Sequence, residues 1–155
     1  MMRIFWSGII CLIMCLDVSI AQTNQTVQLE CGHDNLDIVL PEGFTEIPVT
    51  PDNYGGCYFG YFYSGEDTTL QGSTVMVMWC HNCSVSFSRQ CEIVTKKEYF
   101  LYDGDLYLCD SPTNEQTGDR YYVYQFALGA YHISFSFPIK SLDIFISLIN
   151  QVKHW

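Results

Sequence analysis

YYVYQFALGAYHISFSF, residues 121–137, decides the fold expected for this chain. Two apolar runs lie on either side of Leu128-Gly129-Ala130, and the second run alternates large apolar residues with His132 and two serines. Alternation with a period of two is typical of a strand with one buried and one solvated face. The stretch therefore predicts a pair of strands, with His132 on the solvated side of the second one.

The periodicity changes after this pair of strands. Apolar residues then recur three and four positions apart, which is typical of an amphipathic helix. Pro138 ends the preceding strand, Ser141 is placed to cap the helix, and Lys153 and His154 suit the negative end of its dipole. The apolar positions are Leu142, Phe145, Ile146, Ile149 and Val152. We expect a helix over residues 141–152 that packs on one face of an antiparallel sheet.

Earlier parts of the chain add further predicted strands. Residues 36–40 lead into a Pro-Glu-Gly turn, because proline and glycine end strands and form turns. Residues 57–63 and 75–80 are apolar at nearly every position, as expected for central strands. Residues 84–88 alternate strictly and predict a strand with one wet face. Residues 45–53 contain two prolines and predict a loop.

A hairpin is predicted around Asp103-Gly104. The apolar runs 99–102 and 105–108 flank this pair of residues, which tolerates the positive φ of a tight turn. Residues 111–119 are polar and predict a surface loop.

The N-terminus predicts export. Arg3, an apolar block over residues 4–16 and small residues up to Ala21 indicate a signal peptide cleaved after Ala21. Lipidation of Cys15 is the alternative. The block is too short for a permanent membrane helix, and no second apolar segment is long enough, so we expect no stable membrane insertion. Residues 22–155 would form a single secreted or periplasmic domain.

Charge restricts the class of partner. Seven Lys and Arg residues against seventeen Asp and Glu give a formal net charge of −10. A nucleic-acid partner is not expected, because phosphate binding requires a basic patch. The acidity keeps a chain soluble, and it also favours a partner with a basic surface.

Tyrosines supply the candidate binding residues. Those of residues 57–63, together with Tyr121, Tyr122 and Tyr124, exceed what one sheet face can bury in a small domain. Tyrosine combines contact area with a hydroxyl group and is enriched in recognition surfaces. Tyr121, Tyr122 and Tyr124 are therefore candidates for contact with a protein partner, and the alternative is that they belong to strands buried on both faces.

Six cysteines follow residue 21, and an even number in an exported chain indicates disulfides whose pairing the sequence leaves open. They are Cys31, Cys57, Cys80, Cys83, Cys91 and Cys109. Two sequons make Asn24 and Asn82 candidate glycosylation sites in a eukaryotic secretory pathway.

The segment VMVMWCHNC, residues 75–83, contains the one motif with a chemical interpretation. Cys80 and Cys83 have the spacing of a thiol–disulfide active site, which also needs a helix after the first cysteine. Because residues 84–88 alternate like a strand, we favour structural disulfides from Cys80 and Cys83 to different partners. Thiol–disulfide exchange stays the alternative.

Metal and hydrolytic sites have less support. Cys80, His81, Cys83 and Cys91 offer the ligand types of zinc, but exported cysteines more often oxidise. No nucleophile elbow, metalloprotease helix or phosphate loop is present in the sequence. We expect no metal and no cofactor, and an enzyme is the less favoured class.

The order of elements resembles the PsbP-like fold of photosystem accessory and bacterial envelope proteins. The resemblance lies in the strand that closes on LPEGF at residues 40–44, the antiparallel strands that follow, and the pair at 121–137 leading into the helix at 141–152. It implies an antiparallel sheet with helices on its faces and an accessory role without a catalytic site.

Together these patterns predict one exported α+β domain, an antiparallel sheet braced by disulfides with an amphipathic C-terminal helix packed on one face. The expected function is non-enzymatic binding of a protein partner through an acidic, tyrosine-rich surface. The alternative is a thiol–disulfide oxidoreductase. The oligomeric state is left open.

Overall fold

The computed structural model describes residues 24–48, 56–79, 91–94, 99–110 and 120–154. The expected signal peptide at 1–21, strand at 84–88 and loop at 111–119 lie outside these residues. Within them, no helix has the length and apolar character needed to cross a membrane.

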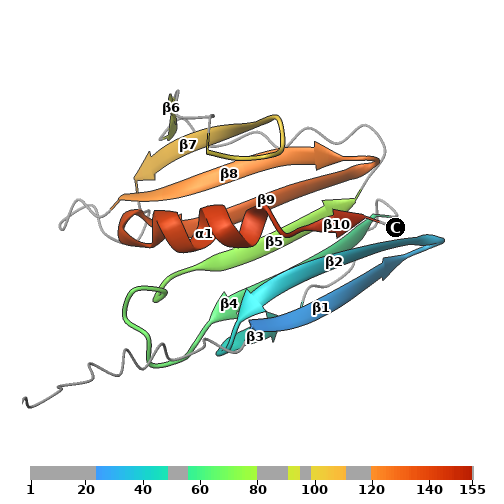
Figure 1. The fold of residues 1–155 in the computed structure, drawn as a ribbon, viewed down its shortest axis with the longest axis horizontal. Coiled ribbons are helices and arrows are strands. Elements are labelled where there is room, and N and C mark those ends of the chain that lie inside the picture. The colour runs from blue at the N-terminus through green and yellow to red at the C-terminus, as the bar shows by residue number, and fades with distance from the viewer. Residues whose placement is uncertain (1–23, 49–55, 80–90, 95–98, 111–119, 155) are drawn as a thin grey trace, which may run out of the picture.

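Two antiparallel sheets make up most of the fold (Figure 1). The small sheet has the order β1-β2-β10, with β1 (Asn24–Cys31), β2 (Asp34–Pro41) and β10 (Lys153–His154). The large sheet has the order β3-β4-β5-β9-β8-β7-β6, with β3 (Phe44–Ile47), β4 (Cys57–Tyr63), β5 (Thr74–Trp79), β6 (Cys91–Val94), β7 (Gly104–Asp110), β8 (Arg120–Leu128) and β9 (Tyr131–Pro138). The antiparallel pairing of β8 with β9 confirms the strand pair expected at residues 121–137.

The large sheet has two different faces. Its core face carries buried apolar side chains, which alternate along each strand with residues of the second face. In β5, Val75 and Val77 are fully buried, whereas Met76 between them is 39% exposed. In β9 the predicted alternation is confirmed, because Tyr131, Ile133, Phe135 and Phe137 are buried and His132 is exposed.

The C-terminal helix is shorter than predicted. A 3-10 turn η1 (Ile139–Ser141) leads into α1 (Leu142–Ile149), and Lys153 and His154 belong to strand β10 instead of the helix end. Ser141 is the N-cap residue of α1, but its side chain makes no capping hydrogen bond, contrary to expectation. It is fully buried, and its hydroxyl donates a hydrogen bond to the carbonyl of Thr69.

Aromatic side chains join α1 to the large sheet. Phe145 stacks on Phe137 with ring centroids 4.4 Å apart and meets Phe135 edge-on at 6.3 Å. Figure 1 shows α1 in front of β9, next to the strands of the small sheet. These contacts bury Phe145 completely.

The hairpin predicted around Asp103-Gly104 is wrong. Residues 99–103 form turns, and β7 starts at Gly104 and pairs with β6 and β8. Phe100 stacks on Tyr124 and Tyr102 stacks on Phe126, so their apolar character serves packing over the core face. The glycine is needed because a Cβ at residue 104 would collide with the carbonyl oxygen of Gln125.

Four other predicted segments can be compared with the structure. The loop expected at 45–53 is wrong in its first part, where β3 pairs with β4 as an edge strand. The strands expected at 36–40, 57–63 and 75–80 are confirmed as parts of β2, β4 and β5, apart from residue 80, which lies outside the described residues.

Two disulfides among the described residues brace the sheets. Cys31–Cys57 joins β1 of the small sheet to β4 of the large sheet, and Cys91–Cys109 joins β6 to β7. Such bonds fit a chain that folds in an oxidising compartment.

Candidate functional site

The three tyrosines proposed as binding residues do not form one surface. Tyr124 is fully buried, stacks on Phe100 at 3.8 Å and donates its hydroxyl to the carbonyl of Tyr102. Tyr122 points to the same core face and packs against Phe137. Since alternate residues of a strand point to opposite faces, only Tyr121 lies on the second face. The prediction of Tyr124 as a binding residue is therefore wrong, and Tyr122 is half-buried against the core.

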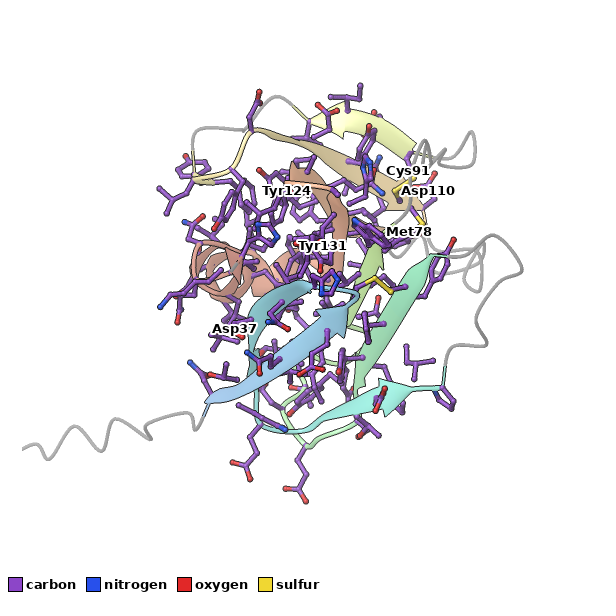
Figure 2. The ribbon with its side chains drawn as sticks, turned by 90° about the vertical axis from the view of Figure 1, so that its right-hand side faces the viewer. Asp37, Met78, Cys91, Asp110, Tyr124 and Tyr131 are labelled. Carbon is purple, nitrogen blue, oxygen red and sulfur yellow. A yellow bond between two sulfur atoms is a disulfide. The ribbon has the colours of Figure 1, made fainter. Side chains whose placement is uncertain are left out.

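A hollow of about 650 Å³ lies on the second face of the large sheet. We call it the sheet hollow. Figure 2 shows that Met78, which lines the hollow, and Tyr131, which lies in the core, are on opposite sides of the large sheet. The side chains that form it are Tyr58, Met76, Met78, Asp103, Asp105, Tyr107, Gln125, Ala127, His132 and Ser134.

Strand register explains the shape of the sheet hollow. Two rows of facing residues cross the strands, namely Asp105, Gln125, Ser134, Met76 and Ala127, His132, Met78, Tyr58. The central strands β8 and β9 supply one small and one longer side chain to each row, namely Ser134 beside Gln125 and Ala127 beside His132. The two small residues leave room in the middle of the sheet face.

One wall of the sheet hollow depends on a glycine. Gly60 lies between Ile47 and Met76 in the register, and a Cβ there would come 3.0 Å from the sulfur of Met76 and 3.3 Å from Ile47. The missing side chain lets Met76 pack closely over β4. Methionine is flexible and polarizable, and it suits surfaces that adapt to a ligand.

The opposite wall is acidic. Asp103 and Asp105 lie at the start of β7, and Asp103 is exposed. Their field reaches the buried Tyr124 hydroxyl. Burial raises the pKa of Tyr124 to about 12, and the charges of Asp103 and Asp105 contribute to the rise.

Farther along β7 and β8, a basic side chain is already paired. Arg120 contacts Glu92 at 2.5 Å and Asp110 at 3.1 Å, at the far end of the β7–β8 pair from Asp105 and Gln125. Val123 and Cys109 on the second face are buried, so the sheet hollow is confined to the other end of the two strands. Among the described residues that line this hollow, Asp103 and Asp105 are the acidic ones.

Sequence reasoning missed most of the sheet hollow. The sequence predicts a strand at 75–80 that is apolar on both faces. This prediction does not distinguish the buried valines from the partly exposed methionines. The signal was present in the alternation of Val75 and Val77 with Met76 and Met78. The sequence pattern favours a hairpin turn for Asp103 over a binding role, whereas the structure places this residue at the edge of the hollow.

The pairing of the other cysteines bears on the motif of Cys80 and Cys83. The two disulfides use Cys31, Cys57, Cys91 and Cys109, so Cys80 and Cys83 do not pair with any of these four. The expectation of different partners within this set is wrong. Cys80, Cys83 and His81 lie outside the described residues.

Metal ligands and glycosylation sites are the remaining candidates. The described residues hold no cluster of three or more His, Cys, Asp or Glu side chains suited to a metal ion. Asn24 is exposed at the start of β1, and Asn82 lies outside the described residues.

Comparisons with known proteins give no relative. No family model matches the chain, and neither a curated protein nor a solved structure matches it significantly. The PsbP-like resemblance therefore stays a prediction.

Proposed function

We propose that this chain is an exported, non-catalytic binding protein that engages a protein partner through the sheet hollow. The single observation that carries the proposal is the composition of this hollow, in which methionines and a tyrosine lie opposite carboxylates on the second face of the large sheet. Aromatic residues and methionine are enriched at protein interfaces.

Three features support the proposal. A pocket that combines apolar contact area with a few polar groups is typical of binding sites. The net charge of −10 favours a basic partner. The two disulfides fit an exported chain, in keeping with cleavage of a signal peptide after Ala21. The PsbP-like resemblance, which implies an accessory role, points in the same direction.

A peptide-display selection on immobilised protein, residues 22–155, tests this function. Peptides that bind are then measured against Ser134→Tyr, which fills the sheet hollow, and against Leu101→Ser as a control on an exposed residue outside it. We expect the selected peptides to lose binding to Ser134→Tyr and to keep it with Leu101→Ser. Equal binding to all three proteins, each shown to be folded by circular dichroism, would contradict the proposal.

Thiol–disulfide exchange at Cys80 and Cys83 is a second candidate, favoured by one observation. The other four cysteines pair among themselves, which leaves Cys80 and Cys83 available for each other. Reduction of insulin disulfides by dithiothreitol, catalysed by the protein or by the Cys80→Ser/Cys83→Ser variant, tests it. Activity that disappears in the variant supports exchange, and equal rates for both proteins reject it.

A further inference from the structure

The two walls of the sheet hollow differ in chemistry and lie a fixed distance apart. Asp105 on β7 and Met76 on β5 belong to one row that crosses β8 and β9. Three strand spacings of about 4.8 Å place these two backbones about 14 Å apart. A ligand that touches both walls must therefore present two unlike groups at this separation.

We propose that the occupant of the sheet hollow is a basic, extended segment of the partner protein. This inference rests on the proposed function. A lysine or arginine of the segment lies against Asp103 and Asp105, and an apolar side chain lies against Met76 and Met78. Because an extended chain rises about 3.3 Å per residue, the basic and the apolar residue are four positions apart.

The basic and the apolar residue must also be an even number of positions apart, and a separation of four positions meets this requirement. Alternate side chains of an extended chain point to opposite sides, so residues separated by four positions both point into the sheet hollow. The floor between the walls carries polar groups, namely Gln125, His132 and Ser134. These groups can hydrogen-bond to the backbone of a segment lying across the strands.

The negative charges of Asp103 and Asp105 favour a cationic group of the ligand at the acidic wall. Asp103 is exposed, Asp105 is partly buried, and both residues line the sheet hollow. A bound ammonium or guanidinium group would donate charge-assisted hydrogen bonds to the carboxylate oxygens. A carboxylate on the ligand would instead be repelled by Asp103 and Asp105.

Matched synthetic peptides test this proposal. The first is Ser-Lys-Thr-Gln-Thr-Leu-Ser, which places lysine and leucine four positions apart. The second replaces lysine with glutamine, and the third moves leucine next to lysine. Fluorescence anisotropy with labelled peptides gives the affinity of each for the protein, residues 22–155.

We expect the glutamine peptide to bind about tenfold more weakly than the lysine peptide, and the peptide with the shortened spacing to bind more weakly too. Asp103→Asn, alone and with Asp105→Asn, should reduce the difference between lysine and glutamine peptides. A matched control, Glu30→Gln with Asp143→Asn, removes two exposed carboxylates outside the sheet hollow and should leave the difference intact.

The outcomes separate this inference from the proposed function. Suppose that Ser134→Tyr abolishes peptide binding but the lysine and glutamine peptides have equal affinities. The proposal of a basic segment is then wrong, and the proposed binding function stands. If the Glu30→Gln/Asp143→Asn control and the aspartate variants lose the lysine preference equally, the effect is one of net charge and the assignment to the sheet hollow is wrong. If Ser134→Tyr blocks no peptide, both fail.

Discussion

Tyrosines illustrate how differently one residue type is used in this molecule. The hydroxyl of Tyr124 donates to the carbonyl of Tyr102, whereas the hydroxyl of Tyr131 is buried with no hydrogen-bond partner among the described residues. Removing one member of a buried hydrogen bond leaves the other unsatisfied, while removing an unsatisfied hydroxyl relieves a cost. These two residues form a matched pair for substitution.

We predict opposite effects for the two phenylalanine variants. Tyr124→Phe should lower the free energy of unfolding by about 1 kcal/mol, and Tyr131→Phe should leave it unchanged or raise it. Urea unfolding of both variants beside the parent protein measures the difference. Equal losses in the two variants would show that hydrogen bonding does not distinguish these tyrosines.

Tyr124 also predicts how stability changes at alkaline pH. Its pKa is raised from 10.0 to about 12, so the unfolded chain releases this proton at a lower pH than the folded chain. The stabilising contribution is fully present below about pH 10 and is lost as the pH rises towards 12. Between these values the parent protein should lose stability more steeply than Tyr124→Phe. Parallel curves from urea unfolding across this range would contradict the prediction.

The helix is the element whose packing can be tested most simply. Phe145 on α1 is fully buried against Phe135 and Phe137, whereas Ser147 on the same helix is exposed. Truncating a buried phenylalanine removes its burial and leaves a cavity. Phe145→Ala should therefore lower the free energy of unfolding by about 3–5 kcal/mol. Ser147→Ala should change it by less than about 0.5 kcal/mol. A small loss in Phe145→Ala would mean that α1 contributes little to the core.

The bond between the two sheets is the second element to test. Cys31–Cys57 links β1 to β4 across 26 residues. Such a link restricts the unfolded chain, and replacing both cysteines with alanine should cost about 2–4 kcal/mol. Thermal unfolding under conditions that keep Cys91–Cys109 intact measures the change. An unchanged midpoint would show that packing alone holds the small sheet on the large one.

Strands were the elements most accessible from sequence, and connections the least. The alternation of residues 131–137 depends only on which side chains are buried, so it predicted β9 correctly. The turns at 99–103 mimic a strand because Phe100 and Tyr102 alternate with exposed residues, yet they stack on Tyr124 and Phe126. The final turn of the predicted helix failed for a related reason. Val152 is buried as expected, but the chain there continues into β10, which pairs with β2.

At the scale of the whole molecule, the candidate site depends on register, which the sequence did not supply. Asp105 and Met76 are 29 positions apart and share a row only because β8 and β9 lie between their strands. An acidic binding surface was foreseeable from the net charge, but its location was not. The methionines of one strand and the carboxylates of another become one site only through the strand order of the large sheet.

The same arrangement predicts the response of binding to salt. If the carboxylates of Asp103 and Asp105 hold a basic segment, raising the ionic strength should lower the affinity of the protein for the lysine peptide. Its affinity for the glutamine peptide should stay nearly unchanged. Anisotropy titrations at low and high sodium chloride concentrations measure this. Equal weakening of both peptides would indicate that the contact with the acidic wall is absent.

The most direct measurement of the central claim uses a property of the sequence itself. After residue 21 the chain contains two methionines, Met76 and Met78, and both line the sheet hollow. Protein labelled with ¹³C on the methionine methyl groups should give two resonances, each of which reports on this site. We predict that the lysine peptide shifts both resonances saturably, and that the glutamine peptide at the same concentration shifts them less. Resonances that stay fixed while the peptide binds would place the binding surface elsewhere and contradict the account.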